Sequence, residues 1–214
     1  MTSRFKTAIF DMDGTLLDSM RFWRLMSVEY LTAHGVFVPD DLLAGVFDRS
    51  GGETIRRVME RLGRDYDAAE ASAELAERMQ YRYARDVMPR AHVKEYLEKL
   101  RKDGLECYVA TATPAPYATA ALERHGLAGY FRKILDFEDV GYTKAQREYY
   151  PALAEKIGRG IGECFMHEDA AYSIRSAKDA GMYVIAIEDS CSVDRREEIR
   201  QMADRYILDF GELL

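Results

Sequence analysis

The chain has 214 residues, of which 48% are hydrophobic and 31% are charged, and its formal net charge at pH 7 is −7. This composition is typical of a globular protein and excludes a fibrous or disordered chain. Acidic and basic residues are interspersed, so nucleic acid and anionic membranes are poor candidate partners. The length favours one core domain that carries a smaller insert.

Cysteine usage and hydropathy indicate the compartment. Cys107, Cys164 and Cys191 are far apart and form no CxxC pair, so we expect reduced thiols in a cytoplasmic protein. The N-terminus reaches Asp11 before any apolar run that could serve as a signal core, and no apolar stretch is long enough to cross a membrane. We therefore expect neither an export signal nor a membrane span.

The first predicted element is a short apolar strand at Lys6–Phe10, which runs directly into the acidic sequence DMDGT at residues 11–15. A strand that ends in acidic loop residues is a candidate functional site.

Residues 17–86 have a different character. Apolar residues recur there at helical spacing, for example at Ile55, Val58 and Leu62, which predicts an all-helical segment. Breaks between its helices are expected at 36–41, 49–52 and 63–67 because Pro, Gly and Asp cluster there.

From residue 87 onward, segments of helical and strand character alternate. Further strands are predicted at Glu106–Ala112, Lys133–Asp136, Glu163–His167, Met182–Ile187 and Tyr206–Leu208. Such alternation implies a parallel sheet with helices on both faces. The predicted fold class is therefore α/β, with a Rossmann-like core at 1–16 and 87–214 and an all-helical cap inserted at 17–86.

The candidate functional residues follow the carboxyl ends of these predicted strands. In an open parallel sheet, ligands bind outside the carboxyl ends of the strands, and polar residues follow several of these ends: Asp11, Asp13, Thr111, Lys144, Glu168 and Asp169. Carboxylates gathered this closely need a counter-ion, and an all-oxygen set suits Mg²⁺. Thr113-Pro114 is typical of a helix N-cap followed by proline, which would aim helix N–H groups at an anion beside Thr111, with phosphate as the obvious candidate.

At this point the sequence resembles the haloacid dehalogenase superfamily, in its helical-cap branch of phosphatases and beta-phosphoglucomutase-like enzymes. Residues 10–19, FDMDGTLLDS, are similar to the first motif of that superfamily almost letter for letter. Residues 109–111 are similar to the second motif and Lys144 to the third. Residues 168–169, together with 177–181, are similar to the fourth, so the resemblance covers nearly the whole chain in the family's order.

The resemblance implies a role for each matched residue. Asp11 would be the nucleophile that forms an aspartyl-phosphate, and Asp13 would protonate the leaving oxygen and later deprotonate the attacking water. Thr111, the Ala112 N–H and Lys144 would hold the phosphoryl group. Mg²⁺ would be held by Asp11, the Asp13 carbonyl and Asp169, with help from Glu168. The substrate would be a small phosphorylated metabolite.

The sequence departs from the family pattern in the cap and in two loops. Where the sugar-phosphate mutases carry a cap histidine and a loop arginine, this chain has Trp23 and Gly51, with Arg49 close by. We expect these three residues to select the substrate. Ala145-Gln146-Arg147 and Ala170–Ser173 also differ from the usual motifs, so we expect a different loop after Lys144 and different support of the metal without loss of a ligand.

Three alternatives to a phosphatase stay open at the level of sequence. A phosphomutase would share every core residue, although the absence of the cap histidine favours hydrolysis. A dehalogenase is less favoured because its chemistry needs no Mg²⁺. A non-catalytic binding protein could retain the fold, but both Asp11 and Asp13 are present. His167 ends a strand and is interpreted as structural. The oligomeric state cannot be predicted.

Overall fold

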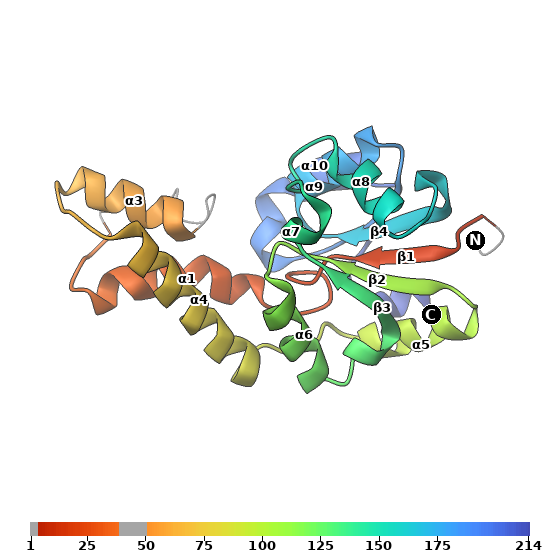
Figure 1. Ribbon diagram of the computed structural model, residues 1–214, viewed down its shortest axis with the longest axis horizontal. Helices are drawn as coiled ribbons and strands as arrows, with labels where there is room; N and C mark the ends of the chain where they lie inside the picture. Colours follow the sequence, from red (N-terminus) through yellow and green to blue (C-terminus); the bar gives the residue numbers. More distant parts are fainter. Residues whose placement is uncertain (1–3, 39–50) are drawn as a thin grey trace. The chain divides into compact units, whose positions relative to one another are not determined.

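A computed structural model describes residues 4–38 and 51–214 of the chain (Figure 1). Its centre is a six-stranded sheet in the order β3-β2-β1-β4-β5-β6, in which every pair of neighbouring strands is parallel. The strands are β1 (Thr7–Phe10), β2 (Glu106–Ala110), β3 (Phe131–Leu135), β4 (Cys164–Glu168), β5 (Tyr183–Ile187) and β6 (Arg205–Ile207). All six predicted strands are present, and the predicted α/β class with a Rossmann-like sheet is confirmed.

Helices cover both faces of the sheet, as is usual for parallel strands joined by crossovers (Figure 1). One face carries α5 (Val93–Lys102) and α6 (Ala115–Arg124), whereas the other carries α8 (Tyr149–Lys156), α9 (Ala171–Asp179) and α10 (Arg196–Met202). The short helix α7 (Phe137–Val140) follows β3. Short segments of 3-10 helix lie at Ala128–Tyr130, Ile161–Glu163, Ser190–Arg195 and Phe210–Leu213.

Alternate side chains of the two central strands point to opposite faces. Ile9 of β1 belongs to the core cluster under α8 and α9, whereas the Phe10 ring stacks on the His167 ring at a centroid distance of 4.0 Å. The His167 side chain also hydrogen-bonds the Tyr96 hydroxyl at 3.1 Å and the Ile9 carbonyl at 3.1 Å. Burial lowers the pKa of His167 to about 3, so a neutral imidazole packs inside the core.

The chain divides into two compact units. One unit comprises the residues up to Asp18 together with Met88–Leu214, and the other is Ser19–Val87. The first boundary lies two residues later than the predicted 16/17 junction. The reason is that Leu17 pairs with Pro89 and the Asp18 N–H donates to the Met88 carbonyl at 2.8 Å, which holds both residues to the sheet unit.

The second unit is built from helices α1 (Met20–Ala33), α3 (Gly51–Arg61) and α4 (Ala68–Arg85). The N-cap Asp67 starts α4 by accepting hydrogen bonds from the N–H groups of Ala69 and Glu70. The buried residues of α4 recur along one stripe: Ala71, Leu75, Met79 and Tyr83. In the part of the chain that the structure describes, this unit contains no strand.

The predicted helix break at residues 49–52 is wrong in its second half. Gly51 and Gly52 form the first turn of α3 instead of a loop. The first N–H groups of any helix lack a partner within the helix, so a start at glycine costs less there than in the helix interior. Arg49 lies outside the described residues.

No helix among the described residues is long and apolar enough to span a membrane. All three cysteines are free thiols.

Candidate active site

The loop after β1 is a tight turn held by its own backbone. The N–H groups of Leu16 and Leu17 both donate to the Met12 carbonyl, and the Gly14 N–H donates to the Leu17 carbonyl. Gly14 has a φ of 84°, a conformation that favours glycine because a Cβ would be strained there. The DMDGT sequence therefore folds back immediately after the strand and keeps Asp11 and Asp13 at the edge of the sheet.

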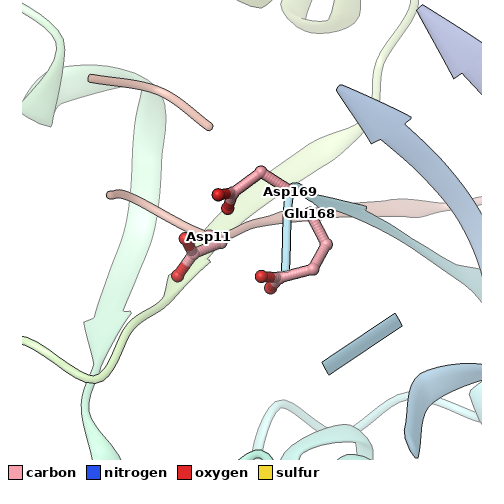
Figure 2. A group of neighbouring side chains, drawn as sticks. All are labelled: Asp11, Glu168 and Asp169. Atoms are coloured by element: carbon pink, nitrogen blue, oxygen red, sulfur yellow. The ribbon is translucent and has the colours of Figure 1, made fainter. Parts of the chain in front are cut away.

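Three carboxylates come together at this edge (Figure 2). Asp11 follows β1, Glu168 ends β4 and Asp169 follows it, and β1 and β4 are neighbours in the sheet. One carboxylate oxygen of each lies within 4.8 Å of the others. All three residues are at most 6% exposed, so these charges lie close together and away from water.

Lys144 provides the positive charge in this cluster. Its Nζ lies 2.5 Å from Asp11 Oδ1 and 2.9 Å from Glu168 Oε2, and the residue is buried. Lys144 lies between α7 and α8, so the loop crosses the carboxyl edge of the sheet to reach the two acids. Lys144 therefore lies beside Asp11 although the sequence that follows it diverges from the usual motif, and its role in holding a phosphoryl group stays a prediction.

One ammonium among three carboxylates does not neutralise them. Burial and the neighbouring Glu168 raise the pKa of Asp11 to about 8, although the Lys144 ammonium opposes that rise. Burial and the charges of Glu168 and Asp11 likewise raise the pKa of Asp169 well above its usual range. Burial disfavours the charged form of Lys144, but the two carboxylates outweigh that effect and hold its pKa well above the ordinary value.

The donor set fits a hard divalent cation. The three clustered side chains offer carboxylate oxygens, the donors that Mg²⁺ prefers, and a cation would offset the burial and the mutual repulsion that raise the pKa values of Asp11 and Asp169. Asp13 does not belong to this side-chain cluster. Its contribution through the backbone carbonyl stays a prediction.

The loop after β2 contributes groups suited to a phosphoryl oxygen. Thr111 is buried and Ala112 is exposed. Among the described residues no partner accepts a hydrogen bond from the Ala112 N–H. Helix α6 starts at Ala115, one residue later than predicted, with Pro114 as its N-cap. The predicted aim of its N–H groups at an anion is wrong for Ala115, because the Ala115 N–H already donates to Asp136 Oδ2 at 2.8 Å.

Two contacts at the site were not predicted from the sequence. Thr113, expected to be an N-cap, instead donates its hydroxyl hydrogen bond to Asp13 Oδ2 at 2.7 Å. The buried Thr15 hydroxyl donates to Asp169 Oδ1 at 3.3 Å. The only sequence signal for Thr15 is its place in the DMDGT motif, and Thr113 has none.

Tyr149, at the start of α8, has a buried hydroxyl without a hydrogen-bond partner in the described part of the chain. A buried unpaired hydroxyl costs about 1–3 kcal/mol. Its neighbour Tyr150 is also fully buried, but its hydroxyl lies 2.6 Å from Ser173 Oγ. The two adjacent tyrosines therefore differ in whether the hydroxyl is satisfied.

This difference gives a matched pair of substitutions. We expect Tyr149→Phe to raise the free energy of unfolding by about 1 kcal/mol, because it removes an unsatisfied group and keeps the ring. Tyr150→Phe should lower it by about 1 kcal/mol, because the Ser173 hydroxyl loses its partner. Urea denaturation of both variants measures the two signs, and a Tyr149→Phe protein that is less stable than wild type would contradict the first.

The residues predicted to select substrate belong to the helical unit. Trp23 lies on α1, and its indole N–H donates to the Tyr83 hydroxyl at 3.3 Å. Gly51 is the first residue of α3. Their role in substrate selection stays a prediction.

The structure thus has a Rossmann-like parallel sheet with a buried carboxylate cluster at its carboxyl edge. A family model described as haloacid dehalogenase-like hydrolase matches residues 8–187. The chain therefore belongs to the haloacid dehalogenase-like hydrolases, and the predicted family and hydrolase class are confirmed.

Named relatives agree with this assignment. The chain is 28% identical over 188 residues to validoxylamine A 7'-phosphate phosphatase of Streptomyces hygroscopicus subsp. limoneus, with 86% of this chain and 85% of that protein covered. It is 26% identical over 198 residues to hexitol phosphatase A of Escherichia coli, at 92% and 89% coverage. CbbY from Rhodobacter sphaeroides, solved in complex with phosphate, has a TM-score of 0.78 and 22% identity over 98% of this chain and 96% of that one.

Proposed function

We propose that this protein is a Mg²⁺-dependent phosphatase that hydrolyses a small phosphomonoester through an aspartyl-phosphate on Asp11. The observation that carries the proposal is the buried cluster in which Lys144 Nζ contacts both Asp11 and Glu168 while Asp169 lies beside them. Such a cluster combines a carboxylate that can attack phosphorus with a positive charge that can stabilise the transferring phosphoryl group.

In the first half-reaction, an Asp11 carboxylate oxygen forms a bond to phosphorus as the bond to the leaving oxygen breaks. Asp13 gives its proton to that leaving oxygen. Lys144, the Thr111 hydroxyl and the Ala112 N–H hold the phosphoryl oxygens, and Lys144 also offsets the charge on Asp11.

In the second half-reaction, Asp13 takes a proton from water, whose oxygen attacks phosphorus and releases inorganic phosphate, which regenerates the Asp11 carboxylate. Asp11, Asp169, Glu168 and the Asp13 carbonyl would hold Mg²⁺. The ion would supply charge stabilisation for the transferring phosphoryl oxygens.

We assign the role of the family's substrate-selecting cap to the helical unit, Ser19–Val87. Core residues contact the phosphoryl group that every substrate shares, whereas the cap would contact the leaving group. This division of labour follows from the insertion of the helical segment between Asp11 and the rest of the site in sequence. The relatives named as phosphatases of a hexitol or of validoxylamine 7'-phosphate suggest phosphorylated polyols and sugars as the first substrates to test.

A panel of phosphorylated metabolites tests both parts of the proposal. Wild type should release inorganic phosphate from at least one member, and chelation should stop the release. Lys144→Ala should lower kcat/KM for every substrate by a similar factor, whereas Trp23→Ala and Gly51→Leu should change the order of preference.

The proposal fails in part if Lys144→Ala reorders the panel while the two helical-unit variants scale all substrates equally. Movement of the phosphoryl group to a second position of the same substrate, instead of release, would identify a mutase.

A further inference from the structure

Thr113 makes a close contact with Asp13 that the proposed reaction does not yet explain. The Thr113 hydroxyl donates to Asp13 Oδ2 at 2.7 Å, and Thr113 is only 4% exposed. The two residues come from the loops after β2 and β1, which are neighbouring strands of the sheet. A short hydrogen bond to a carboxylate, largely shielded from water, restrains the orientation of that carboxylate.

The loop that carries Thr113 is itself fixed. The Thr113 N–H donates to Thr111 Oγ1 at 3.0 Å. The next N–H along the chain is that of Ala115, the first residue of α6, and it donates to Asp136 Oδ2 at 2.8 Å. The buried Asp136 also accepts from the N–H groups of Glu138 and Asp139 through its other oxygen, at 2.9 and 3.1 Å. Asp136 therefore links the starts of α6 and α7 through hydrogen bonds, and these bonds restrain the loop that contains Thr113.

We propose that Thr113 is the positioning residue for the acid/base Asp13, an assignment that rests on the proposed function above. Because the hydroxyl donates to Oδ2, the proton that Asp13 delivers to the leaving oxygen resides on Oδ1. Oδ1 likewise receives the proton taken from water in the second half-reaction. Throughout the cycle the Thr113 proton stays on Thr113, and the hydrogen bond sets the direction in which Oδ1 points.

The same loop links acid/base chemistry to phosphoryl binding. Thr111, which we assign to the phosphoryl group, accepts from the Thr113 N–H, while the Thr113 side chain holds Asp13. One short turn thus sets the distance between the phosphoryl-binding hydroxyl and the carboxyl group that protonates the leaving oxygen. Proton transfer tolerates little displacement of the acid, so this restraint matters most when the leaving group needs a proton.

The leaving group provides a readout that a merely structural role would not change. An alkyl alcohol needs a proton as it leaves, whereas p-nitrophenolate leaves without one. Thr113→Val keeps the shape and removes the donor. We expect it to lower kcat/KM for an alkyl phosphomonoester by roughly 10²-fold, the lower end of general acid contributions, and to lower kcat/KM for p-nitrophenyl phosphate at least tenfold less.

Thr113→Ser keeps a hydroxyl and should restore most of the activity on the alkyl substrate. Thr119→Val is the matched control, because Thr119 donates its hydroxyl hydrogen bond to the Ala115 carbonyl within α6 and does not contact Asp13. It should leave the ratio of the two kcat/KM values unchanged. If Thr113→Val does not fold, Thr113→Ala makes the same comparison, since it removes the donor without adding bulk.

If Thr113→Val keeps the wild-type ratio of the two kcat/KM values, whether both fall equally or neither falls, the assignment of Thr113 is overturned while the proposed phosphatase stands. A wild-type protein that releases phosphate from neither of these substrates and from no member of the metabolite panel in the presence of Mg²⁺ would instead overturn the proposed function, and the role of Thr113 with it.

Discussion

Asp11→Asn is expected to abolish turnover, with kcat lower by a factor on the order of 10⁶, as when other enzymes lose a nucleophile. The amide keeps the shape of the side chain but has no anionic oxygen to attack phosphorus. Folding should persist, because Lys144 keeps its contact with Glu168 at 2.9 Å. The amide carries no charge, so it also removes the burial cost and the repulsion from Glu168 that raise the pKa of Asp11.

The measurement is single-substrate kinetics beside thermal unfolding of the same preparation. Asp194→Asn is the matched control: the same chemical change at an exposed position of the sheet unit, expected to leave both quantities unchanged. Near-normal turnover by a well-folded Asp11→Asn protein would exclude the aspartyl-phosphate mechanism.

The second large effect concerns the metal. Mg²⁺ at 100 times its Kd should stabilise the wild-type fold by about 2.7 kcal/mol, because it binds the folded cluster and not the unfolded chain. Asp169→Asn should lose most of this stabilisation, since it removes one of the three clustered carboxylates. It should also lower turnover sharply, although Asp11 and Lys144 remain. A substitution at Asp169 tests metal binding separately from nucleophilic attack, because the proposed mechanism gives Asp169 no covalent role.

Thermal unfolding with and without Mg²⁺, at constant ionic strength, measures this stabilisation. The Asp194→Asn control should respond to Mg²⁺ as wild type does. A wild-type melting temperature that does not change with millimolar Mg²⁺, or full activity after exhaustive chelation, would argue against the metal assignment.

Much of the site follows from local sequence and from one property of parallel sheets. Asp11, Thr111 and Glu168 each lie at or just after the end of an apolar strand, and all parallel strands end at the same edge. Once the strands are recognised, these residues must converge whatever the details of packing. The strand positions themselves were predictable because short apolar runs alternate with helical segments, although individual strand ends shifted by one or two residues.

Contacts between distant parts of the chain could be decided only by the tertiary structure. Lys144 is 133 residues from Asp11 in sequence, and Thr113 is 100 residues from Asp13. Neither a lysine in a divergent loop nor a threonine before a proline indicates locally which carboxylate it contacts, because that depends on how the loops cross the edge of the sheet. The Tyr149 hydroxyl likewise has no local signal, since whether a buried group finds a partner is set by the packing of α8 against the sheet. Sequence thus determined which chemical groups reach the carboxyl edge, and the three-dimensional packing decided which of them touch.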